Sequence, residues 1–246
     1  MTFKQVKTTD KIILKHLEKE DKESLEARNK TKFHLSDSGQ CMKKRYVKRL
    51  GLPPTREMTR DELWTFQAGH IFHEYIQGIL TEELADKDQA EKTKIEISEG
   101  EVEDEHFIGH YDLAVVKPDM VVVYEFKTTS GLKHLKKENK PYDHHVIQLA
   151  NYMDFLATDK PVVGHIYYIG KDLRWTVDTL EYASALTSEL SEKVRKERAE
   201  LVSMWETKTV PPCTCSGWEK KEKYNGWAKY CSMSDKELKK EMRDNE

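Results

Sequence analysis

Two carboxylates and a lysine near the middle of the chain have residue types suited to metal-dependent hydrolysis. Asp112 ends the run Gly109-His110-Tyr111-Asp112, and Glu125 and Lys127 lie on either side of Phe126. Two neighbouring carboxylates repel each other unless a cation lies between them. Their oxygens suit Mg²⁺ or Mn²⁺, and such an ion can activate water and stabilise charge on a phosphate. Lys127 would then orient the attacking water or stabilise the charged transition state.

The Glu-x-Lys spacing alone is common in this sequence. Its six copies start at Glu20, Glu125, Glu138, Glu206, Glu219 and Glu237. Only the copy at Glu125 ends an apolar run, 120–128, which predicts a strand because it is rich in β-branched residues. Strand side chains alternate, so Glu125 and Lys127 share a face on which unpaired charges are unfavourable. The alternative is a strand that enters solvent at its end.

The preceding strand is expected to bring Asp112 to this pair. Residues 106–116 predict a strand, and 117–119 predict a tight turn between it and the strand at 120–128. Pairing of the two strands in a hairpin would place Asp112 and Glu125 close together.

Three more polar residues lie on predicted helices. His73 is a candidate metal ligand on helix 61–84, and imidazole suits Mn²⁺ better than Mg²⁺. Gln148 and Tyr152, four residues apart, share a face of helix 143–157, from which they could reach a substrate phosphate or the lysine. The alternatives are a structural histidine and ordinary surface packing. The histidines without a comparable argument are His70, His110, His134, His144 and His145.

Hydrophobic periodicity and turn residues predict the other elements. Helices are expected at 14–34, 61–84, 143–157 and 182–205, strands at 94–98, 106–116, 120–128, 162–169 and 174–180, and a lysine-rich loop at 130–142. The apolar stripe of helix 61–84 consists of Leu63, Phe66, Ile71, Tyr75, Ile79 and Leu80, with Thr59 as the expected cap. The order α, β, β, β, α, β predicts an α/β fold with a mixed sheet flanked by helices.

Composition and charge restrict the class of protein. The chain has 246 residues, enough for one large domain, and 37% hydrophobic residues exclude a disordered chain. No apolar run reaches the length of a membrane helix, and the N-terminus lacks a secretory signal, so we expect a cytoplasmic protein. A net charge of −3 gives no global indication of nucleic-acid binding. Segment 41–60 has a local charge of +6, seven basic residues against Glu57, which fits either phosphate contacts or a solvated helix face.

The four cysteines are Cys41, Cys213, Cys215 and Cys231. A chain without an export signal has little need of disulfides. Three thiols close together near the C-terminus favour a metal or cluster site.

Together these motifs resemble the PD-(D/E)XK nuclease superfamily, in its RecB-like branch. The branch patterns are G-x-x-x-H, G-x-x-D, E-x-K and Q-x-x-x-Y, matched in order by Gly69 with His73, Gly109 with Asp112, Glu125 with Lys127 and Gln148 with Tyr152. The resemblance implies a restriction-endonuclease-like αβββαβ core at about 61–180 within a single nuclease domain, 1–246.

The resemblance also assigns roles to these residues. It implies that the metal is held by His73, Asp112, Glu125 and the backbone carbonyl of Phe126. It implies further that Lys127 assists catalysis, and that Gln148 and Tyr152 support the site or bind DNA.

The cysteines resemble those of the CRISPR-associated exonucleases and AddB-type nuclease domains of this branch. One cysteine before the core and three after it bind an iron–sulfur cluster there, which implies a helical cap here formed by 36–54 and 207–232, with [4Fe–4S] favoured over [2Fe–2S]. The family's usual C-x2-C is replaced by C-x-C, and fifteen residues then precede Cys231, so a four-cysteine Zn²⁺ site is the alternative. The aromatic residues among the last cysteines either stack on single-stranded bases or pack around the cluster, and they are Trp218, Tyr224, Trp227 and Tyr230.

The leading expectation is a DNA exonuclease that hydrolyses phosphodiester bonds in single-stranded DNA or at DNA ends, with Mg²⁺ or Mn²⁺. One alternative is a catalytically silent DNA-binding or scaffold protein of the same fold. Another is a regulator that uses the cysteines as a redox or metal sensor. Partner proteins of DNA repair, recombination or spacer acquisition are compatible with the resemblance, as is phage DNA processing, and no membrane partner is expected.

Overall fold

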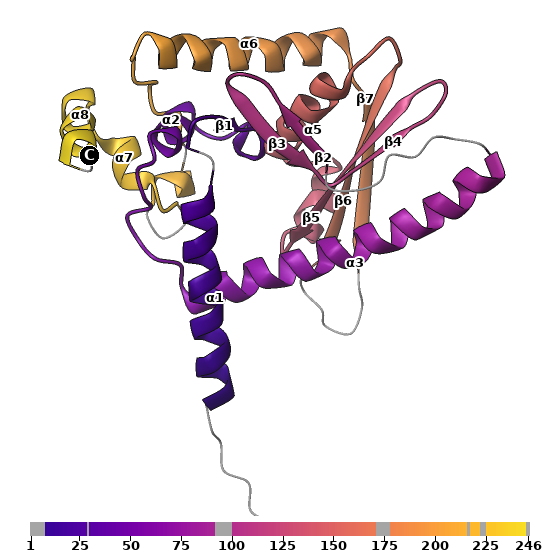
Figure 1. Cartoon of the computed structure of the whole chain (residues 1–246), viewed down its shortest axis with the longest axis horizontal. Coiled ribbons are helices and arrows are strands. Elements are labelled where there is room, and N and C mark those ends of the chain that lie inside the picture. Colours follow the sequence, from indigo (N-terminus) through magenta and orange to yellow (C-terminus); the bar gives the residue numbers. More distant parts are fainter. Residues whose placement is uncertain are drawn as a thin grey trace, which may run out of the picture.

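A mixed four-stranded sheet lies at the centre of the protein (Figure 1). The computed structural model describes residues 8–28, 30–91, 100–170, 178–215, 217–221 and 225–244. The elements in chain order are α1 (Thr8–Ala27), β1 (Phe33–His34), the 3₁₀ helix η1 (Leu35–Asp37), α2 (Met42–Arg49), α3 (Arg60–Glu91), β2 (Gly100–Glu103), β3 (Phe107–Tyr111), β4 (Leu113–Val116), β5 (Val121–Thr129), α4 (Leu132–Glu138), α5 (Asp143–Leu156), β6 (Val162–Gly170), β7 (Thr179–Ala185), α6 (Ser188–Glu206), the 3₁₀ helix η2 (Gly217–Lys220), α7 (Ala228–Ser232) and α8 (Asp235–Asp244).

The central sheet has the strand order β4-β5-β6-β7, with β5 and β6 parallel and the two outer pairs antiparallel. The strand β5 begins with three buried valines, 121–123, because helices cover both of its faces. On one face α5 contributes Leu149 and Met153, which share a hydrophobic core with Val123. The run of β-branched residues that predicted this strand is therefore buried on both faces of the sheet.

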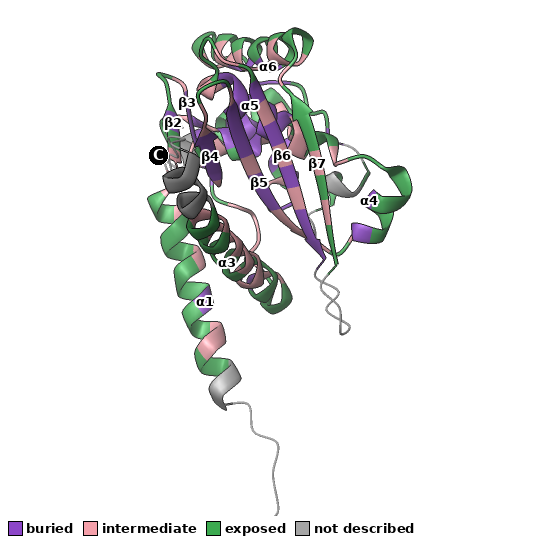
Figure 2. Ribbon diagram, turned by 90° about the vertical axis from the view of Figure 1, so that its right-hand side faces the viewer, coloured by how far each residue is buried: buried purple, intermediate pink, exposed green. Residues whose placement is uncertain are grey.

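Helices lie on both sides of this sheet. Figures 1 and 2 show α3 crossing the face opposite α5, and α6 packed outside α5. The ring of His73 on α3 meets the ring of Phe126 on β5 edge-on, with 6.2 Å between their centroids. The prediction of a mixed sheet flanked by helices is confirmed. None of the described helices combines the length and the apolar character needed to span a lipid bilayer.

The predicted strand 106–116 is broken at Asp112 into β3 and β4, which belong to different sheets. Pairing of β4 with β5 starts at Leu113, opposite Tyr124. One residue earlier, the Oδ2 atom of Asp112 accepts a hydrogen bond of 2.6 Å from the backbone N–H of Phe126. The Asp112 carboxylate thus replaces a backbone carbonyl as the acceptor for the N–H group of Phe126. Pairing with β5 ends there, and β3 belongs to a second sheet of order β1-β3-β2.

Several predicted boundaries were wrong. The predicted loop 130–142 contains the helix α4, whose two apolar residues Leu132 and Leu135 are buried but too few to give a periodic signal. The strand β7 continues to Ala185, so α6 begins at Ser188 rather than near residue 182. The helix expected at 14–34 is α1, which ends at Ala27. The expected strand 94–98 lies outside the described residues, as does 174–177 of the expected strand 174–180.

The long helix α3 does not bury its predicted apolar stripe. Only Leu63 is buried, whereas Phe66, Ile71 and Tyr75 are 55–66% exposed. Within the described residues α3 contacts the strand β5 and the helix α1, and much of the predicted stripe stays exposed to solvent. The expected cap is confirmed, because Glu62 N donates to the hydroxyl of Thr59 at 3.3 Å.

The basic segment 41–60 is neither a phosphate-binding patch nor a solvated face over most of its length. Arg45 is buried and paired with Glu197, and the Nζ atom of Lys48 lies 2.6 Å from the Oδ1 atom of Asp37. Lys43 is also buried and donates to a backbone carbonyl. These charges are partnered inside the protein, so they join α2 to α6 and η1.

Gly109 allows β3 to approach two neighbouring elements closely. A Cβ atom added at this position would lie 2.7 Å from the Cβ atom of Leu35 and 2.8 Å from the Cε1 atom of Tyr152. Neither neighbour can move easily, because both side chains are fully buried.

We predict that Gly109→Ala lowers the free energy of unfolding by about 1–3 kcal/mol, because the added methyl group overpacks this contact. The matched control is Gly78→Ala in α3, where an added Cβ atom meets nothing within 4 Å. The control should stabilise by up to about 1 kcal/mol, since alanine is the better helix former. Urea unfolding of both variants measures the effect, and an unchanged Gly109→Ala curve would contradict the packing argument.

Candidate active site

The structure brings Asp112 and Glu125 together at the point where β4 leaves the central sheet. The antiparallel register of β4 and β5 ends at Leu113, which pairs with Tyr124, and Asp112 is the residue just before this last pair. Besides burial, the charge of Asp112 acts on Glu125 and raises the pKa of that carboxyl group. The two carboxylates are therefore neighbours at the end of β4.

Glu125 is buried, with only 2% of its surface exposed. Its Oε1 atom lies 2.5 Å from the Nζ atom of Lys127 and accepts a hydrogen bond of 2.8 Å from Gln148. Its Oε2 atom is buried without a hydrogen-bond partner among the described residues. Burial, and to a lesser extent the nearby charge of Asp112, raise the pKa of Glu125 to about 7. A buried carboxylate oxygen that lacks a partner is the position that a cation would occupy.

Asp112 connects this carboxylate to α3. While its Oδ2 atom accepts the hydrogen bond from Phe126, its Oδ1 atom lies 3.6 Å from the Nδ1 atom of His73. The helix comes close to β5 one turn before this histidine, because a Cβ atom on Gly69 would lie 3.4 Å from the Oγ1 atom of Thr128. One imidazole and two carboxylates are thus neighbours, and donors of these types suit Mn²⁺ or Mg²⁺.

The backbone of Phe126 points to the same place. Its N–H group is directed to Asp112, and the N–H and C=O groups of one strand residue point to the same side. The Phe126 carbonyl is therefore on the side of Asp112, while the aromatic side chain is buried in the sheet.

Gln148 and Tyr152 lie in the protein interior and not on a substrate surface. The Nε2 atom of Gln148 donates to Glu125 and, at 3.4 Å, to the hydroxyl of Tyr152. Both side chains are buried, and burial raises the pKa of Tyr152 above its usual value, which keeps the hydroxyl protonated. The sequence predicted contacts with a substrate phosphate or with the lysine, whereas Gln148 contacts the carboxylate of Glu125.

His145 lies beside Lys127, although no sequence motif indicated a function for this histidine. The Nδ1 atom of His145 is 2.8 Å from the hydroxyl of Tyr168, and Tyr168 is the register partner of Lys127 on β6. Burial, then the charges of Lys127 and His144, lower the pKa of His145 to about 2, so its ring is neutral. The spacing of His145 and Gln148 could have indicated this position, because residues three apart lie on the same face of a helix.

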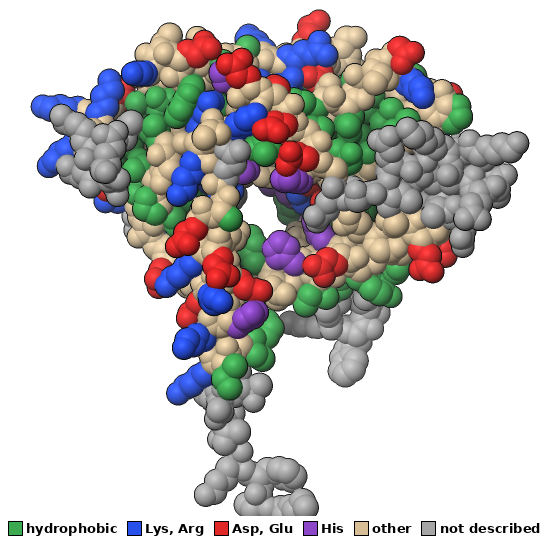
Figure 3. All heavy atoms as spheres, viewed as in Figure 1, with side chains coloured by type: hydrophobic (Ala, Val, Ile, Leu, Met, Phe, Trp, Pro, Cys, Tyr) green, Lys and Arg blue, Asp and Glu red, His purple; other side chains and the backbone are tan. Residues whose placement is uncertain are grey.

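A hollow lies between α1, α3 and the strands, and histidine side chains gather at its rim (Figure 3).

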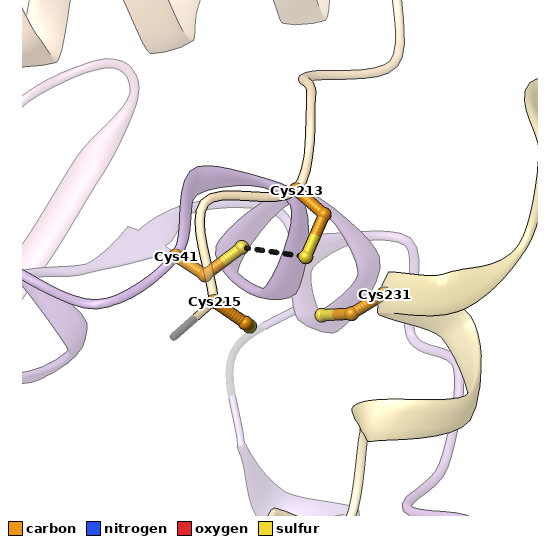
Figure 4. A group of neighbouring side chains, drawn as sticks. All are labelled: Cys41, Cys213, Cys215 and Cys231. Atoms are coloured by element: carbon orange, nitrogen blue, oxygen red, sulfur yellow. Dashed lines mark hydrogen bonds between the residues drawn. The ribbon is translucent and has the colours of Figure 1, made fainter. Parts of the chain in front are cut away.

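The four cysteines form a second candidate metal centre (Figure 4). Their sulfur atoms all lie within 4.8 Å of one another, and the Sγ atoms of Cys41 and Cys213 are 4.0 Å apart. Cys41 precedes α2, Cys213 and Cys215 follow α6, and Cys231 lies on α7. In the part of the chain that the structure describes, no other group of three or more ligand side chains is as tightly spaced.

Ionisation of one cysteine thiol opposes ionisation of its neighbours. A hydrogen bond from Cys231 lowers the pKa of Cys41 to about 3, whereas burial and the Cys41 thiolate raise the pKa of Cys215 to about 12. Deprotonation of all four sulfurs therefore needs a bound cation.

The neighbouring aromatic residues serve packing where they are described. Trp227 donates from its ring nitrogen to the carbonyl of Leu52 at 3.0 Å, and Tyr230 is buried. The side chains of Trp218 and Tyr224 lie outside the described part.

Comparison with known proteins finds one family. The sequence model of the PD-(D/E)XK nuclease superfamily matches residues 40–235. Among solved structures, the crystal structure of SSO0001 is similar, with a TM-score of 0.46, 17% identity, and coverage of 85% of this chain and 95% of that chain. The alkaline exonuclease LHK-Exo from Laribacter hongkongensis has a TM-score of 0.49, 14% identity, and coverage of 76% and 94%. Its complex with dAMP has a TM-score of 0.46, 15% identity, and coverage of 72% and 89%. No curated protein sequence matches.

We predict that stability without added Mg²⁺ or Mn²⁺ falls as the pH rises from about 4.5 to 7, because only the folded state keeps a proton on Glu125 in that range. Glu125→Gln removes this dependence and should raise the free energy of unfolding at pH 8 by roughly 3 kcal/mol. Thermal unfolding across this pH range measures both effects.

The matched control is Glu18→Gln, a carboxyl group on the exposed side of α1. It should keep the pH dependence of the wild type. If stability depended on pH in the same way for the wild type and Glu125→Gln, the raised pKa of Glu125 would be contradicted.

Proposed function

Because the chain belongs to the PD-(D/E)XK nuclease superfamily, we propose that it hydrolyses phosphodiester bonds of DNA with Mg²⁺ or Mn²⁺. The observation that carries this proposal is the unpartnered Oε2 atom of Glu125, buried beside a second carboxylate. Lys127 and Gln148 both contact the Oε1 atom, so the Oε2 atom is the part of this buried carboxylate that is left to bind a cation.

The residues proposed to hold the ion are His73, Asp112, Glu125 and the backbone carbonyl of Phe126. A divalent ion bound there would lower the pKa of a coordinated water and polarise the phosphate. Gln148 fixes the Glu125 carboxylate through its 2.8 Å hydrogen bond, and so directs the free oxygen away from α5. Asp112 is fixed in the same way by the backbone of β5.

Lys127 is the proposed catalytic cation. It lies on the same face of β5 as Glu125 and is partly exposed, so its ammonium group can reach both the carboxylate and a substrate. Next to a phosphate it would stabilise the charge that develops during attack, or orient the attacking water. His145 and Tyr168 line the other side of this lysine as neutral groups and do not compete for its charge.

We also propose that the substrate is single-stranded DNA or a DNA end, and that residues 1–246 form one nuclease domain. The hollow beside α3 supports an extended, unpaired substrate, since a free strand enters a hollow more readily than a continuous duplex does. The alternative of a catalytically silent DNA-binding protein is disfavoured, because Lys127 and both carboxylates are present and adjacent. A role of this protein in DNA repair, recombination or spacer acquisition is a prediction that rests on the family resemblance alone.

The cysteine centre is proposed to hold a structural metal that joins the chain ends. The family resemblance favours an iron–sulfur cluster, in which the thiolates bind different irons and therefore lie further apart than thiolates around a single ion. A single tetrahedral Zn²⁺ with bonds of about 2.3 Å places its sulfurs about 3.8 Å apart. Sulfur atoms within 4.8 Å, with one pair at 4.0 Å, fit the zinc alternative better, and we propose Zn²⁺ on this ground.

For the active site, we predict that Lys127→Ala lowers the cleavage rate of end-labelled DNA with Mn²⁺ by at least about 100-fold. DNA affinity measured in Ca²⁺ should change little, because the acidic site is intact. The matched control is Lys22→Ala, from a second Glu-x-Lys copy on the exposed surface of α1, which should cleave normally. Normal cleavage by Lys127→Ala would remove this residue from the mechanism, and a wild type that binds but never cleaves would favour the scaffold alternative.

For the cysteine centre, we predict that protein purified without oxygen is colourless and contains one zinc per chain. Cys231→Ser should lose the zinc and unfold at a lower temperature, since metal binding contributes directly to folding. Elemental analysis and thermal unfolding measure this, with Lys127→Ala as the control that keeps its zinc. A brown protein containing several irons per chain would establish the cluster instead.

A further inference from the structure

A row of aromatic side chains leads outward from Lys127. Its inner member is Tyr168, which pairs with Lys127 in the β5–β6 register. The hydroxyl of Tyr168 accepts a hydrogen bond of 3.2 Å from the backbone N–H of Tyr142, and the two rings meet edge-on with centroids 6.1 Å apart. Tyr142 is therefore the next ring beyond the proposed active site.

Tyr142 stacks with two histidines at the surface. Its ring is nearly parallel to that of His144, with centroids 5.7 Å apart and 21° between the planes. It is also nearly parallel to His134, at 6.4 Å and 24°. Both histidines are exposed and Tyr142 is half-buried. We call His134, Tyr142 and His144 the ring ladder.

The backbone holds the central ring in place. A Cβ atom on Gly131 would lie 2.3 Å from the hydroxyl of Tyr142, so the ring extends across this glycine just after the end of β5. A pocket of about 170 Å³ opens beside it, lined among others by His134, Tyr142 and Lys140. The ladder is thus anchored at one end and open to solvent at the other.

Positive charge surrounds the ladder. The segment 132–140 has four lysines and one glutamate, and the lysines are Lys133, Lys136, Lys137 and Lys140. All four are exposed. Two of them have carboxylates nearby, Lys136 with Asp178 at 2.5 Å and Lys140 with Asp143 at 3.9 Å, on the surface where solvent weakens such pairs.

We propose that the ring ladder is a base-stacking site for single-stranded DNA, continuous with the active site at Lys127. Exposed aromatic faces among lysines are the arrangement that binds unpaired bases together with their phosphates. In a duplex the base faces are covered by one another, so only an unpaired strand can use this site. The proposal rests on the proposed function and names the form of substrate that the same site accepts.

The experiment measures binding, not cleavage, and uses the full chain with Lys127→Ala in Ca²⁺. The probes are a labelled thymidine oligonucleotide, the same oligonucleotide with abasic residues, and a blunt duplex. Tyr142→Ala should weaken binding of the thymidine probe about tenfold, within the range for loss of one stacked base. Tyr142→Phe keeps the ring and should bind like the parent.

The abasic probe separates stacking from charge. Abasic residues should weaken binding to the parent protein by a similar factor, but should cause no further loss with Tyr142→Ala, since ring and base contribute through one contact. Duplex affinity should be the same for both proteins. Because Tyr142 also packs on Tyr168, His134→Ala at the exposed end of the ladder serves as a second variant, which should show a smaller loss in the same direction.

Unchanged binding of the thymidine probe by folded Tyr142→Ala and His134→Ala would overturn the proposal. Equal losses on the duplex and the single strand would also overturn it, since they would indicate a general loss of charge or shape. These results are distinct from failure of the proposed function, which would appear as absence of Mn²⁺-dependent cleavage by the wild type whatever the binding data show.

Discussion

The structure depends on one unfavourable arrangement, two neighbouring carboxylates held inside the protein. The charge of Asp112 acts on Glu125, and one oxygen of Glu125 is buried without a partner among the described residues. Nothing in ordinary packing favours such a pair, because burial and mutual repulsion both oppose the ionised state. The surrounding elements make the arrangement possible, and a divalent ion is what would make it stable.

The neighbouring elements each hold one part of this pair. The backbone of Phe126 binds Asp112, which ends the pairing of β4 and sends the chain into the second sheet. On the other side Gln148 binds Glu125, and Tyr152 stands behind Gln148 against the backbone of Gly109. In the function we propose, the glycine, glutamine and tyrosine of the sequence motifs are positioning residues, and the carboxylates and Lys127 are the groups that would meet a substrate.

What could be predicted from the sequence was local, and what could not was formed between distant segments. The strand β5 and the helix α5 follow from their own periodicity, and with them the shared face of Glu125 and Lys127. The break at Asp112 could not be predicted, because a hydrogen bond to a residue fourteen positions away causes it. The burial of Arg45 depends on Glu197, 152 residues further along the chain. The cysteines could be grouped by residue type, but the spacing of their sulfurs needed coordinates.

The cysteine centre ties together parts of the chain that are synthesised at different times. Cys41 lies before the nuclease core, whereas Cys231 comes about 190 residues later, after every strand of the sheet. A ribosome-bound chain can therefore form the sheet and its helices while the metal site still lacks its last ligand. The site is therefore completed only after the sheet has been synthesised, and a chain cut short before α7 would expose the apolar surface of α2 to the cell's proteases.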